Sequence, residues 1–241
     1  MAYFSLYNDC KSVNDHQLAN EGVYLTTRER REREKEERRQ SLLRAAREVF
    51  FEHGFHRATV DNVAERAEVS KGTVYLYFES KETILAHLLL EGLCELIEEL
   101  ERAYAASEGT TADERLRQLS WAYLQFFRRE PTYFRFLMAM DRGQFREAVT
   151  AEVYQEVLEA SMHGLNLAVQ AVEQGIDDGA LSCCDAQQAA ATVWATLNGV
   201  LELMNHPLRR EMMGVGVEVL YRTAIETVIR GLQAQATGPG A

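Results

Sequence analysis

A chain of 241 residues with 46% hydrophobic residues is long enough to bury a sizeable core, as one large domain or as a small domain joined to a larger one. The formal net charge of -11 excludes a protein that coats nucleic acid unselectively, because such binding rests on many Lys and Arg contacts with phosphate. The charge is also uneven. Residues 28 to 90 carry 13 Lys plus Arg against 12 Asp plus Glu (+1), whereas residues 91 to 241 carry 12 against 22 (-10). Any contact with DNA is therefore expected in the first part of the chain.

The first segments in chain order are an extension and a charged helix. Residues 1 to 27 mix Tyr, Asn, Asp, Ser and Gly without a helical or alternating period, which predicts a poorly ordered extension. Residues 28 to 40 interleave Arg and Glu at spacings of three and four, which favours a solvated helix held by side-chain pairs. A second interpretation is a basic arm that reaches the DNA backbone. Its candidate contacts are Arg28, Arg30, Arg31 and Arg33.

The rest of the chain is predicted to be helical. From Ser41, apolar residues recur at helical spacing up to Gly54, a natural left-handed cap. Further helices are expected at 81–105, about 112–128, about 132–140, 146–176, 185–205 and about 212–234. The expectation is an all-α fold of about nine helices. It comprises a disordered extension (1–27), a three-helix N-terminal DNA-binding domain with a helix-turn-helix (28–85), a larger helical ligand-binding and dimerisation domain (86–234) and a disordered tail (235–241).

The cysteines predict a reduced compartment and neither a metal site nor a cofactor. The four of them, at 10, 94, 183 and 184, form no CxxC pair and no tetrahedral spacing with the six histidines. The adjacent Cys183 and Cys184 are typical of an incidental loop pair, with a redox or soft-metal sensor as the alternative. Without an apolar run of 18 residues or a signal-like start, we expect a cytoplasmic protein with no membrane partner.

Residues 55 to 82, FHRATVDNVAERAEVSKGTVYLYFESKE, predict two short helices joined by a turn. Thr59 and Ser70 are placed to cap these helices, and Ser80 to cap the next one. Such capped starts present backbone amides, which suit phosphate oxygens. In the second helix, Lys71 to about Tyr77, the inward side chains are expected to be Val74 and Phe78. The outward ones are then Lys71, Thr73, Tyr75 and Tyr77.

The outward residues have the chemistry of DNA contact. Tyr75 and Tyr77 offer hydroxyls to phosphate or an aromatic edge to a thymine methyl, and Lys71 can reach a phosphate or a guanine edge. Gly72 is expected where a Cβ would come close to the DNA backbone or to the preceding helix. The alternative is that aromatic residues on so short a helix belong to the core.

The string TVDNVAERAEVSKGTVYLYFESKETIL resembles the signature of the TetR family, T-[TV]-x-x-[IV]-A-x-x-A-G-V-S-x-G-[TAS]-[LVIF]-Y-x-[YH]-F-x-x-K-E-x-L. The resemblance implies that the second short helix is a recognition helix for the major groove. It also implies DNA contacts, to which we add the cap Ser70. The full set is Thr59, Ser70, Lys71, Gly72, Thr73, Tyr75, Tyr77 and Lys81. One position departs from the signature, because Glu68 stands where the family usually has Gly. A positive φ at Glu68 would cost about 1 kcal/mol, so either the turn differs or a small strain is tolerated.

After residue 90 the resemblance weakens, and aromatic residues become the main signal. Residues 121 to 140, WAYLQFFRREPTYFRFLMAM, are typical either of core packing or of a pocket for an apolar or aromatic small molecule. On the following long helix the apolar stripe is expected at Tyr154, Val157, Leu158, Met162, Leu165, Val169 and Val172. The predicted pocket residues are Trp121, Phe126, Tyr133, Phe134, Met138, Tyr154, Met162, His163 and Asn166.

The last two predicted helices carry more apolar surface than one subunit needs to cover. The resemblance implies that they pair with their copies in a four-helix bundle at a homodimer interface. The residues expected there are Trp194, Leu197, Leu201, Leu220, Ala224, Ile225 and Val228. A two-fold dimer would place two recognition helices about 34 to 36 Å apart on a palindrome.

These observations predict a homodimeric DNA-binding transcriptional regulator, a repressor released from double-stranded DNA when a small-molecule effector binds. Activation is the alternative sign. An enzyme or ligand carrier on a helical bundle is disfavoured, because the chain has no nucleophile elbow, P-loop, dinucleotide fingerprint or HExxH motif. A third hypothesis is a DNA-binding module whose larger domain only dimerises and binds partners. Loss of operator binding in the presence of a ligand would distinguish the first hypothesis from the third.

Overall fold

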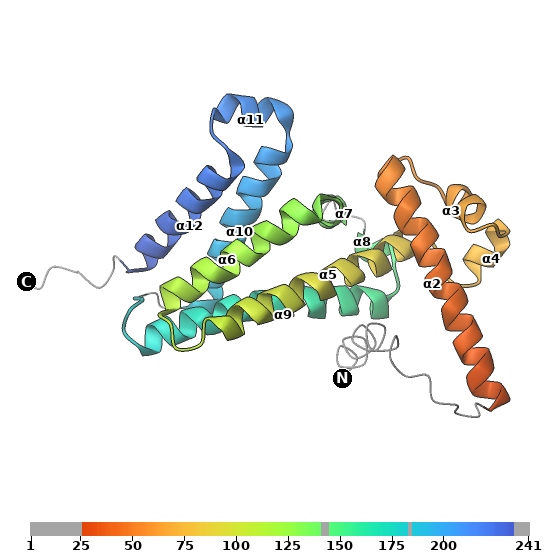
Figure 1. Ribbon diagram of the computed structural model, residues 1–241, viewed down its shortest axis with the longest axis horizontal. Helices are drawn as coiled ribbons and strands as arrows, with labels where there is room; N and C mark the ends of the chain where they lie inside the picture. Colours follow the sequence, from red (N-terminus) through yellow and green to blue (C-terminus); the bar gives the residue numbers. More distant parts are fainter. Residues whose placement is uncertain (1–25, 141–144, 183–184, 234–241) are drawn as a thin grey trace, which may run out of the picture. The chain divides into compact units, whose positions relative to one another are not determined.

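The structure is a computed structural model that describes residues 26–140, 145–182 and 185–233, with the side chains of 138–140 left aside. The described residues form eleven helices and no β-strand, which confirms the all-α prediction (Figure 1). The predicted tail, the pair Cys183 and Cys184, and residues 1–25 of the predicted extension lie outside the described residues. The helices are α2 (Thr27–His53), α3 (Val60–Arg66), α4 (Lys71–Tyr75), α5 (Lys81–Ala106), α6 (Ala112–Arg129), α7 (Pro131–Met140), α8 (Phe145–Ala148), α9 (Ala151–Asp177), α10 (Ala186–Asn205), α11 (Pro207–Met213) and α12 (Val217–Gln233).

Helix α2 joins the charged segment and the first core helix into one continuous element (Figure 1). It begins with a capping box, in which the Glu29 amide donates to Thr26 Oγ1 (3.3 Å) and the Thr26 amide donates to Glu29 Oε2 (2.7 Å). It ends at Gly54, whose φ of 73° suits a residue without Cβ. Its buried residues all come from Leu42 onward, so the first half of the helix lies outside the core.

Contacts within the chain define two compact units. The first contains the residues up to Glu95 together with Glu130–Ala160, and the second contains Leu96–Arg129 and the residues from Ser161 onward. Helices α5 and α9 each contribute to both units. Helix α7 joins the first unit because Phe136 packs edge-on against Phe50 of α2, with ring centroids 6.2 Å apart. The predicted division at residues 85 and 86 differs from this grouping and stays a prediction.

The second unit is organised by hydrogen bonds from buried tyrosines. The hydroxyl of Tyr123 on α6 donates to Asn198 Oδ1 on α10 (2.9 Å), and the hydroxyl of Tyr221 on α12 donates to the Ser120 carbonyl (2.9 Å). Each bond satisfies a buried polar group, so α6, α10 and α12 are held in a fixed register. Helices α10 and α12 also pack on each other along their length.

Three predicted helix details are wrong. The segment 146–176 is broken between α8 and α9, where Thr150 Oγ1 accepts from the Val153 amide (3.4 Å). The last predicted helix, about 212–234, is interrupted by Gly214 at φ 64°, so α11 precedes it and α12 begins at Val217. On α9, Leu158 and Met162 are exposed by 38% and 49%. The buried hydrophobic residues of α9 are Val157 and Val172, which the predicted stripe included, and Ala160, Leu167 and Ala171, which it did not.

None of the described helices has the length and apolar character needed to span a membrane.

Candidate DNA-binding site

Helix α3 begins as predicted, at a reciprocal cap. Thr59 Oγ1 accepts from the Asn62 amide (3.2 Å), and Asn62 Oδ1 accepts from the Thr59 amide (3.1 Å). The side chains of Val60, Val63 and Ala64 are buried, so they attach the helix to the core. Thr59 itself is exposed at the surface.

The turn between α3 and α4 keeps a left-handed residue at Glu68. Its φ is 54°, the only positive φ of a non-glycine residue within the described ranges. The Val69 amide donates to the Ala64 carbonyl (3.0 Å) and the Glu68 amide to the Glu65 carbonyl (3.1 Å), the pair of bonds that closes a Schellman motif. The turn therefore keeps the left-handed geometry that the usual glycine would adopt, and Glu68 is strained in it.

Helix α4 has one buried face and one exposed face, as predicted. Val74 and Phe78 are almost fully buried, and Ser70 Oγ accepts from the Thr73 amide (3.1 Å). Lys71, Gly72 and Tyr75 are exposed on the opposite side, whereas Thr73 and Tyr77 are half-buried. A Cβ on Gly72 would meet only Ser70 Oγ, at 3.6 Å. The preceding helix therefore does not require glycine there, and the approach of DNA to Gly72 stays a prediction.

Two of the predicted cationic contacts already have partners within the chain. Lys71 Nζ lies 2.7 Å from Asp61 Oδ2 on α3, and this pair raises the pKa of Lys71. Lys81 Nζ donates to the carbonyls of Phe55 (3.0 Å) and Ala58 (3.3 Å) and lies 4.3 Å from the centre of the Phe55 ring. Lys81 therefore ties the start of α5 to the turn between α2 and α3.

Leu76 is the surface residue that the sequence prediction missed. It follows α4 directly and is 79% exposed, more than Tyr75 at 47%. It is the fourth residue after Gly72, so both share one helical face, and a side chain at the later position leans over the earlier one. A signal was present in the sequence, because Leu76 lies two residues from each of the inward positions Val74 and Phe78 and must point away from both.

Helix α5 attaches the helix-turn-helix to the rest of the chain. Ser80 Oγ accepts from the Thr83 amide (3.0 Å) and donates to the Ala148 carbonyl (3.2 Å), so the predicted cap is present. Further along α5, Glu91 forms an ion pair with Arg47 of α2. The Arg47 Nε atom is buried without a hydrogen-bond partner, which leaves this pair incompletely satisfied.

The predicted pocket residues have several different surroundings. In the first unit Tyr133 and Phe134 are buried, and Tyr154 packs against Phe145 with centroids 6.1 Å apart. In the second unit Phe126 is buried, and His163 Nε2 lies 2.9 Å from Glu101 Oε1. Trp121, Met162 and Asn166 are exposed there, with the Trp121 ring 5.4 Å from the Arg222 guanidinium of α12. The side chain of Met138 lies outside the described residues. The role of the predicted pocket residues in binding a ligand stays a prediction.

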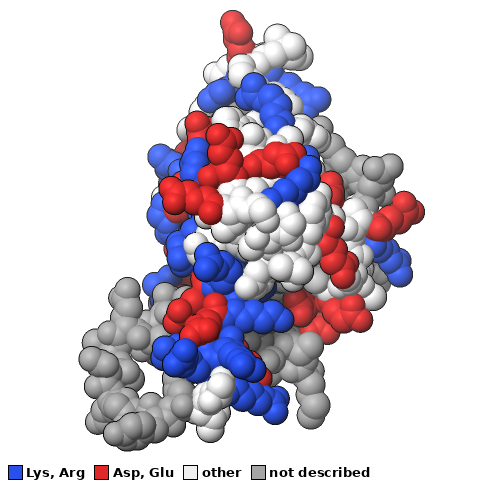
Figure 2. All heavy atoms as spheres, turned by 90° about the vertical axis from the view of Figure 1, so that its right-hand side faces the viewer, with Lys and Arg blue, Asp and Glu red and all other residues white. Residues whose placement is uncertain are grey.

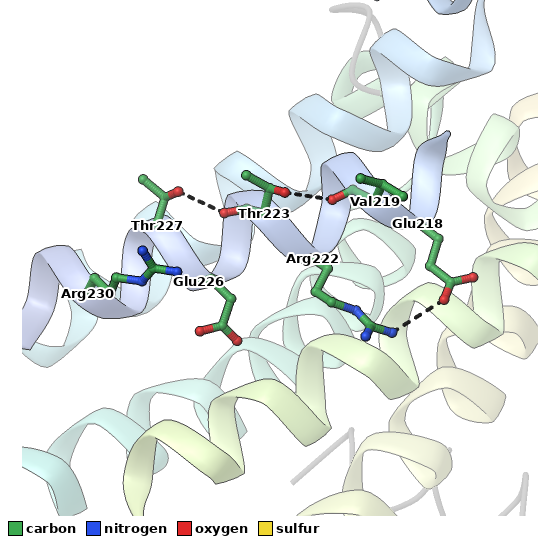
Figure 3. Close-up of a pocket in the computed structure, with 7 residues that line it drawn as sticks. All are labelled: Glu218, Val219, Arg222, Thr223, Glu226, Thr227 and Arg230. Carbon is green, nitrogen blue, oxygen red and sulfur yellow. Dashed lines mark hydrogen bonds and ion pairs between the residues drawn. The ribbon is translucent and has the colours of Figure 1, made fainter. Parts of the chain in front are cut away.

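A surface groove of about 460 Å³ lies on α12 and contains none of the predicted pocket residues (Figure 3). Several of its polar side chains are bonded within α12, since the hydroxyls of Thr223 and Thr227 donate to the carbonyls four residues earlier and Arg222 donates to Glu218. The groove residues are Glu218, Val219, Arg222, Thr223, Glu226, Thr227 and Arg230.

The predicted dimer residues divide into two groups. Leu197, Leu201 and Ile225 are buried within the subunit where α10 packs on α12, so they present no surface to a second copy. Leu220, Ala224 and Val228 are half-buried. Trp194, at 44% exposed, keeps a free apolar surface on α10. Of the predicted dimer residues, Trp194, Leu220, Ala224 and Val228 therefore keep surface that a second copy could cover, and the interface stays a prediction.

Comparison with known proteins agrees with the geometry of the helix-turn-helix. Residues 42–88, from α2 to the first turns of α5, match the family of bacterial regulatory proteins called tetR. The fatty acid metabolism regulator protein of Bacillus subtilis (strain 168) is 41% identical over 75 residues, which are 31% of this chain and 38% of that relative. This chain thus matches less than half the length of that relative.

Two further likenesses extend over most of the chain. The HTH-type transcriptional regulator YhgD of the same Bacillus subtilis strain is 26% identical over 201 residues, 82% of this chain and 98% of that relative. The regulator FadR from Bacillus subtilis, solved in complex with stearoyl-CoA, has a TM-score of 0.60 at 24% identity. The match covers 80% of this chain and 98% of that one, and it shows a shared fold.

These relatives are transcriptional regulators, in agreement with the prediction that this chain is not an enzyme. With its capped α3, its left-handed turn and its exposed α4, this part of the chain has the helix-turn-helix of the bacterial regulatory proteins of the tetR family, which residues 42–88 match.

Proposed function

We propose that this protein is a repressor that binds a palindromic operator as a homodimer and releases it when a small apolar ligand binds beyond residue 85. The observation that carries the proposal is the outward face of α4, where Lys71, Gly72, Tyr75 and Leu76 are exposed above the buried Val74 and Phe78. A face that combines a cation, a hydroxyl and apolar side chains suits the edges and phosphates of a major groove.

The connection through α5 supports control by a ligand. Lys81 fixes the start of this helix to the turn before α3, and the same helix continues to Ala106 in the second unit. A ligand that favours a different position of α5 would move α4 with it. A difference of about 1 to 3 kcal/mol in ligand affinity between the two states is enough for a useful change in DNA affinity.

The first ligand to test is a long-chain fatty acyl-CoA. One relative is named as a regulator of fatty acid metabolism, and a structural neighbour was solved with stearoyl-CoA. An acyl chain agrees with the apolar ligand predicted from the residues of α6, α7 and α9. The names of these relatives give no support to the alternative of an aromatic ligand.

The first experiment measures binding of the purified protein to DNA from its own promoter region, with and without stearoyl-CoA. Tyr75→Ala and Lys71→Ala are compared with wild type at two salt concentrations. Leu208→Ala is the matched control, because Leu208 is 70% exposed on α11, outside the helix-turn-helix. We expect weaker binding by both α4 variants, normal binding by the control, and release of wild type by stearoyl-CoA.

The outcomes separate the parts of the proposal. Binding that stearoyl-CoA and other apolar ligands leave unchanged would favour a DNA-binding module without an effector. If wild type binds the promoter fragment no more tightly than an unrelated duplex, the proposal of an operator there is overturned. A promoter-reporter assay in a strain without the protein decides the sign, since a repressor raises expression when it is removed and an activator lowers it.

A further inference from the structure

The first half of α2 projects beyond the core. Every residue from Thr27 to Arg38 is exposed, and the first buried side chain is Leu42. At 1.5 Å per residue this segment, which we call the α2 arm, is about 18 Å long. Such a length of helix with no apolar face needs either strong side-chain pairing or a partner to remain ordered.

Most arginines of the α2 arm are engaged by glutamates of the same helix. Arg28 lies 2.9 Å from Glu32, Arg30 lies 3.1 Å from Glu34, and the distance from Arg33 to Glu37 is 3.3 Å. These exposed pairs are weak, but each places a negative charge beside the guanidinium. Three of the four residues predicted to contact DNA are therefore locally neutralised.

A second set of cations on the α2 arm has no such pair. Within the described residues, Arg31, Lys35 and Arg38 form no ion pair, although acidic residues surround them in sequence. Their spacing of four and three residues places them on one face of the helix, over about 10 Å. Arg31 and Lys35, as like charges four apart, oppose helix formation by about 0.2 to 0.5 kcal/mol. A bound anion would remove that repulsion. We call these three residues the basic stripe.

Most cations of the helix-turn-helix segment 55–82 have partners. The exception is Arg57, which is exposed, donates only to the His53 carbonyl (3.2 Å) and forms no ion pair within the described residues. Lys71 is paired with Asp61, and Arg66 contacts Glu48 (2.8 Å) and Glu52 (2.7 Å). Lys81 is held by backbone carbonyls. Figure 2 views the side on which α2, α3 and α4 lie, and blue side chains gather in its lower part, where α2 begins. Among the described residues, the α2 arm therefore carries three exposed cations without an ion pair on one face, whereas the helix-turn-helix segment carries one, Arg57.

We propose that the basic stripe of Arg31, Lys35 and Arg38 binds phosphates of duplex DNA outside the base pairs that α4 contacts. This deepens the proposed function and rests on it, because it assumes that α4 brings the protein to DNA. The stripe adds affinity without sequence preference, since it offers only cations to the backbone. It accounts for DNA binding by a chain with a net charge of -11.

The test is the salt dependence of DNA affinity. Each phosphate contact contributes about 0.9 to the slope of log K against log salt on duplex DNA. The variant Arg31→Gln/Lys35→Gln/Arg38→Gln should therefore lower the slope by up to about 3 for each bound subunit. We expect this on the promoter fragment and on an unrelated duplex alike. Gln keeps a good helix propensity, and circular dichroism checks that the helix content is unchanged.

The matched control removes the same charge from the paired face of the arm. Arg28→Gln/Arg30→Gln/Arg33→Gln changes the net charge equally, so any long-range effect is shared by both triple variants. A large fall in slope for the stripe variant and a small one for the control supports the proposal. Equal falls, or no fall in either, would overturn it. If wild type binds its promoter fragment no more tightly than the unrelated duplex, the proposed function is contradicted. The proposal for the basic stripe is still tested in that case, because its effect on the salt slope is also measured on the unrelated duplex.

Discussion

The ring of Tyr133 lies against the backbone of α5 at Gly92. A Cβ built on Gly92 would be 2.6 Å from Cγ and 2.9 Å from Cε1 of Tyr133, closer than real side chains approach. Tyr133 is 5% exposed and also packs edge-on against Phe51 of α2, with centroids 5.8 Å apart. The glycine therefore lets α7 come close to α5, next to the ion pair of Glu91 with Arg47.

We predict that Gly92→Ala destabilises the protein. Alanine gains about 1 kcal/mol in helix propensity, but overpacking a buried ring costs about 1 to 3 kcal/mol, so a net loss of about 1 kcal/mol is expected. Urea denaturation measures it. Gly231→Ala is the control, because a Cβ there meets nothing within 4 Å and should leave stability equal or higher. A Gly92→Ala protein more stable than wild type would show that Tyr133 moves aside easily.

The turn residue Glu68 permits a second prediction, in which strain and charge are separated. Its φ of 54° costs an L-residue about 1 kcal/mol that glycine does not lose, so Glu68→Gly should raise the free energy of unfolding by about 0.5 to 1 kcal/mol. Glu68→Gln keeps the strain and should leave stability unchanged. Thermal denaturation of the three proteins gives the comparison.

The same two variants test whether the charge of Glu68 lies near DNA. Both lose the carboxylate, so both should bind the promoter fragment more tightly than wild type, by a similar factor that shrinks at high salt. A gain with Gly alone would mean that the strained turn, and not the charge, limits affinity.

Local sequence patterns were enough for the helix-turn-helix. The caps at Thr59, Ser70 and Ser80 and the inward positions Val74 and Phe78 depend on neighbours within four residues, which a sequence displays directly. The positive φ at Glu68 was one of two alternatives, and hydrogen bonds from the turn select it.

Longer-range features could not be predicted in the same way. An apolar period identifies a helix but does not say which neighbour covers it, so Leu197 and Ile225, predicted at a dimer interface, are buried within the subunit. The partners of Lys81 are carbonyls 23 and 26 residues away, which no local pattern specifies. On α9 the sequence does not show which part of the predicted apolar stripe is covered: packing buries Val157 and Val172 and leaves Leu158 and Met162 exposed.

A third prediction concerns Leu76, which we expect to contact a thymine methyl. With 79% of the side chain exposed on the α4 face, the contact would bury apolar surface on both sides. Replacing the contacted thymine by uracil removes one methyl, worth about 0.8 kcal/mol, or about fourfold in the affinity of wild type. Leu76→Ala should bind the thymine and uracil duplexes equally.

The thymines of the bound fragment are replaced one at a time in this experiment, and both proteins are titrated with each duplex. Leu208→Ala, which changes another highly exposed leucine, on α11, should keep the fourfold preference of wild type. If Leu76→Ala retains that preference at every thymine, the residue does not read a methyl group.

The fourth prediction concerns acid stability and His87 on α5. Arg39 Nη2 lies 3.1 Å from His87 Nδ1, and an arginine can only donate, so Nδ1 accepts and the ring is neutral. Burial, with a smaller effect of the Arg39 charge, lowers the pKa of His87 from 6.5 to about 4. In the unfolded chain the ring takes up a proton near pH 6.5, whereas in the folded protein it stays neutral until about pH 4.

The sign of the pH dependence follows from this difference. Between these two values the unfolded state binds more protons, so the free energy of unfolding falls as the pH falls, by up to about 1.4 kcal/mol per unit and about 3 kcal/mol in all. The slope from His87 is about half of its maximum at pH 6.5, where half of the unfolded rings are protonated, and it vanishes well above that pH. Urea denaturation of wild type and His87→Gln from about pH 7 to about pH 4.5 measures the effect, and subtraction removes other groups such as Glu156, whose pKa burial raises. Wild type should lose stability faster than the variant, and parallel curves would show that His87 is protonated in the folded protein.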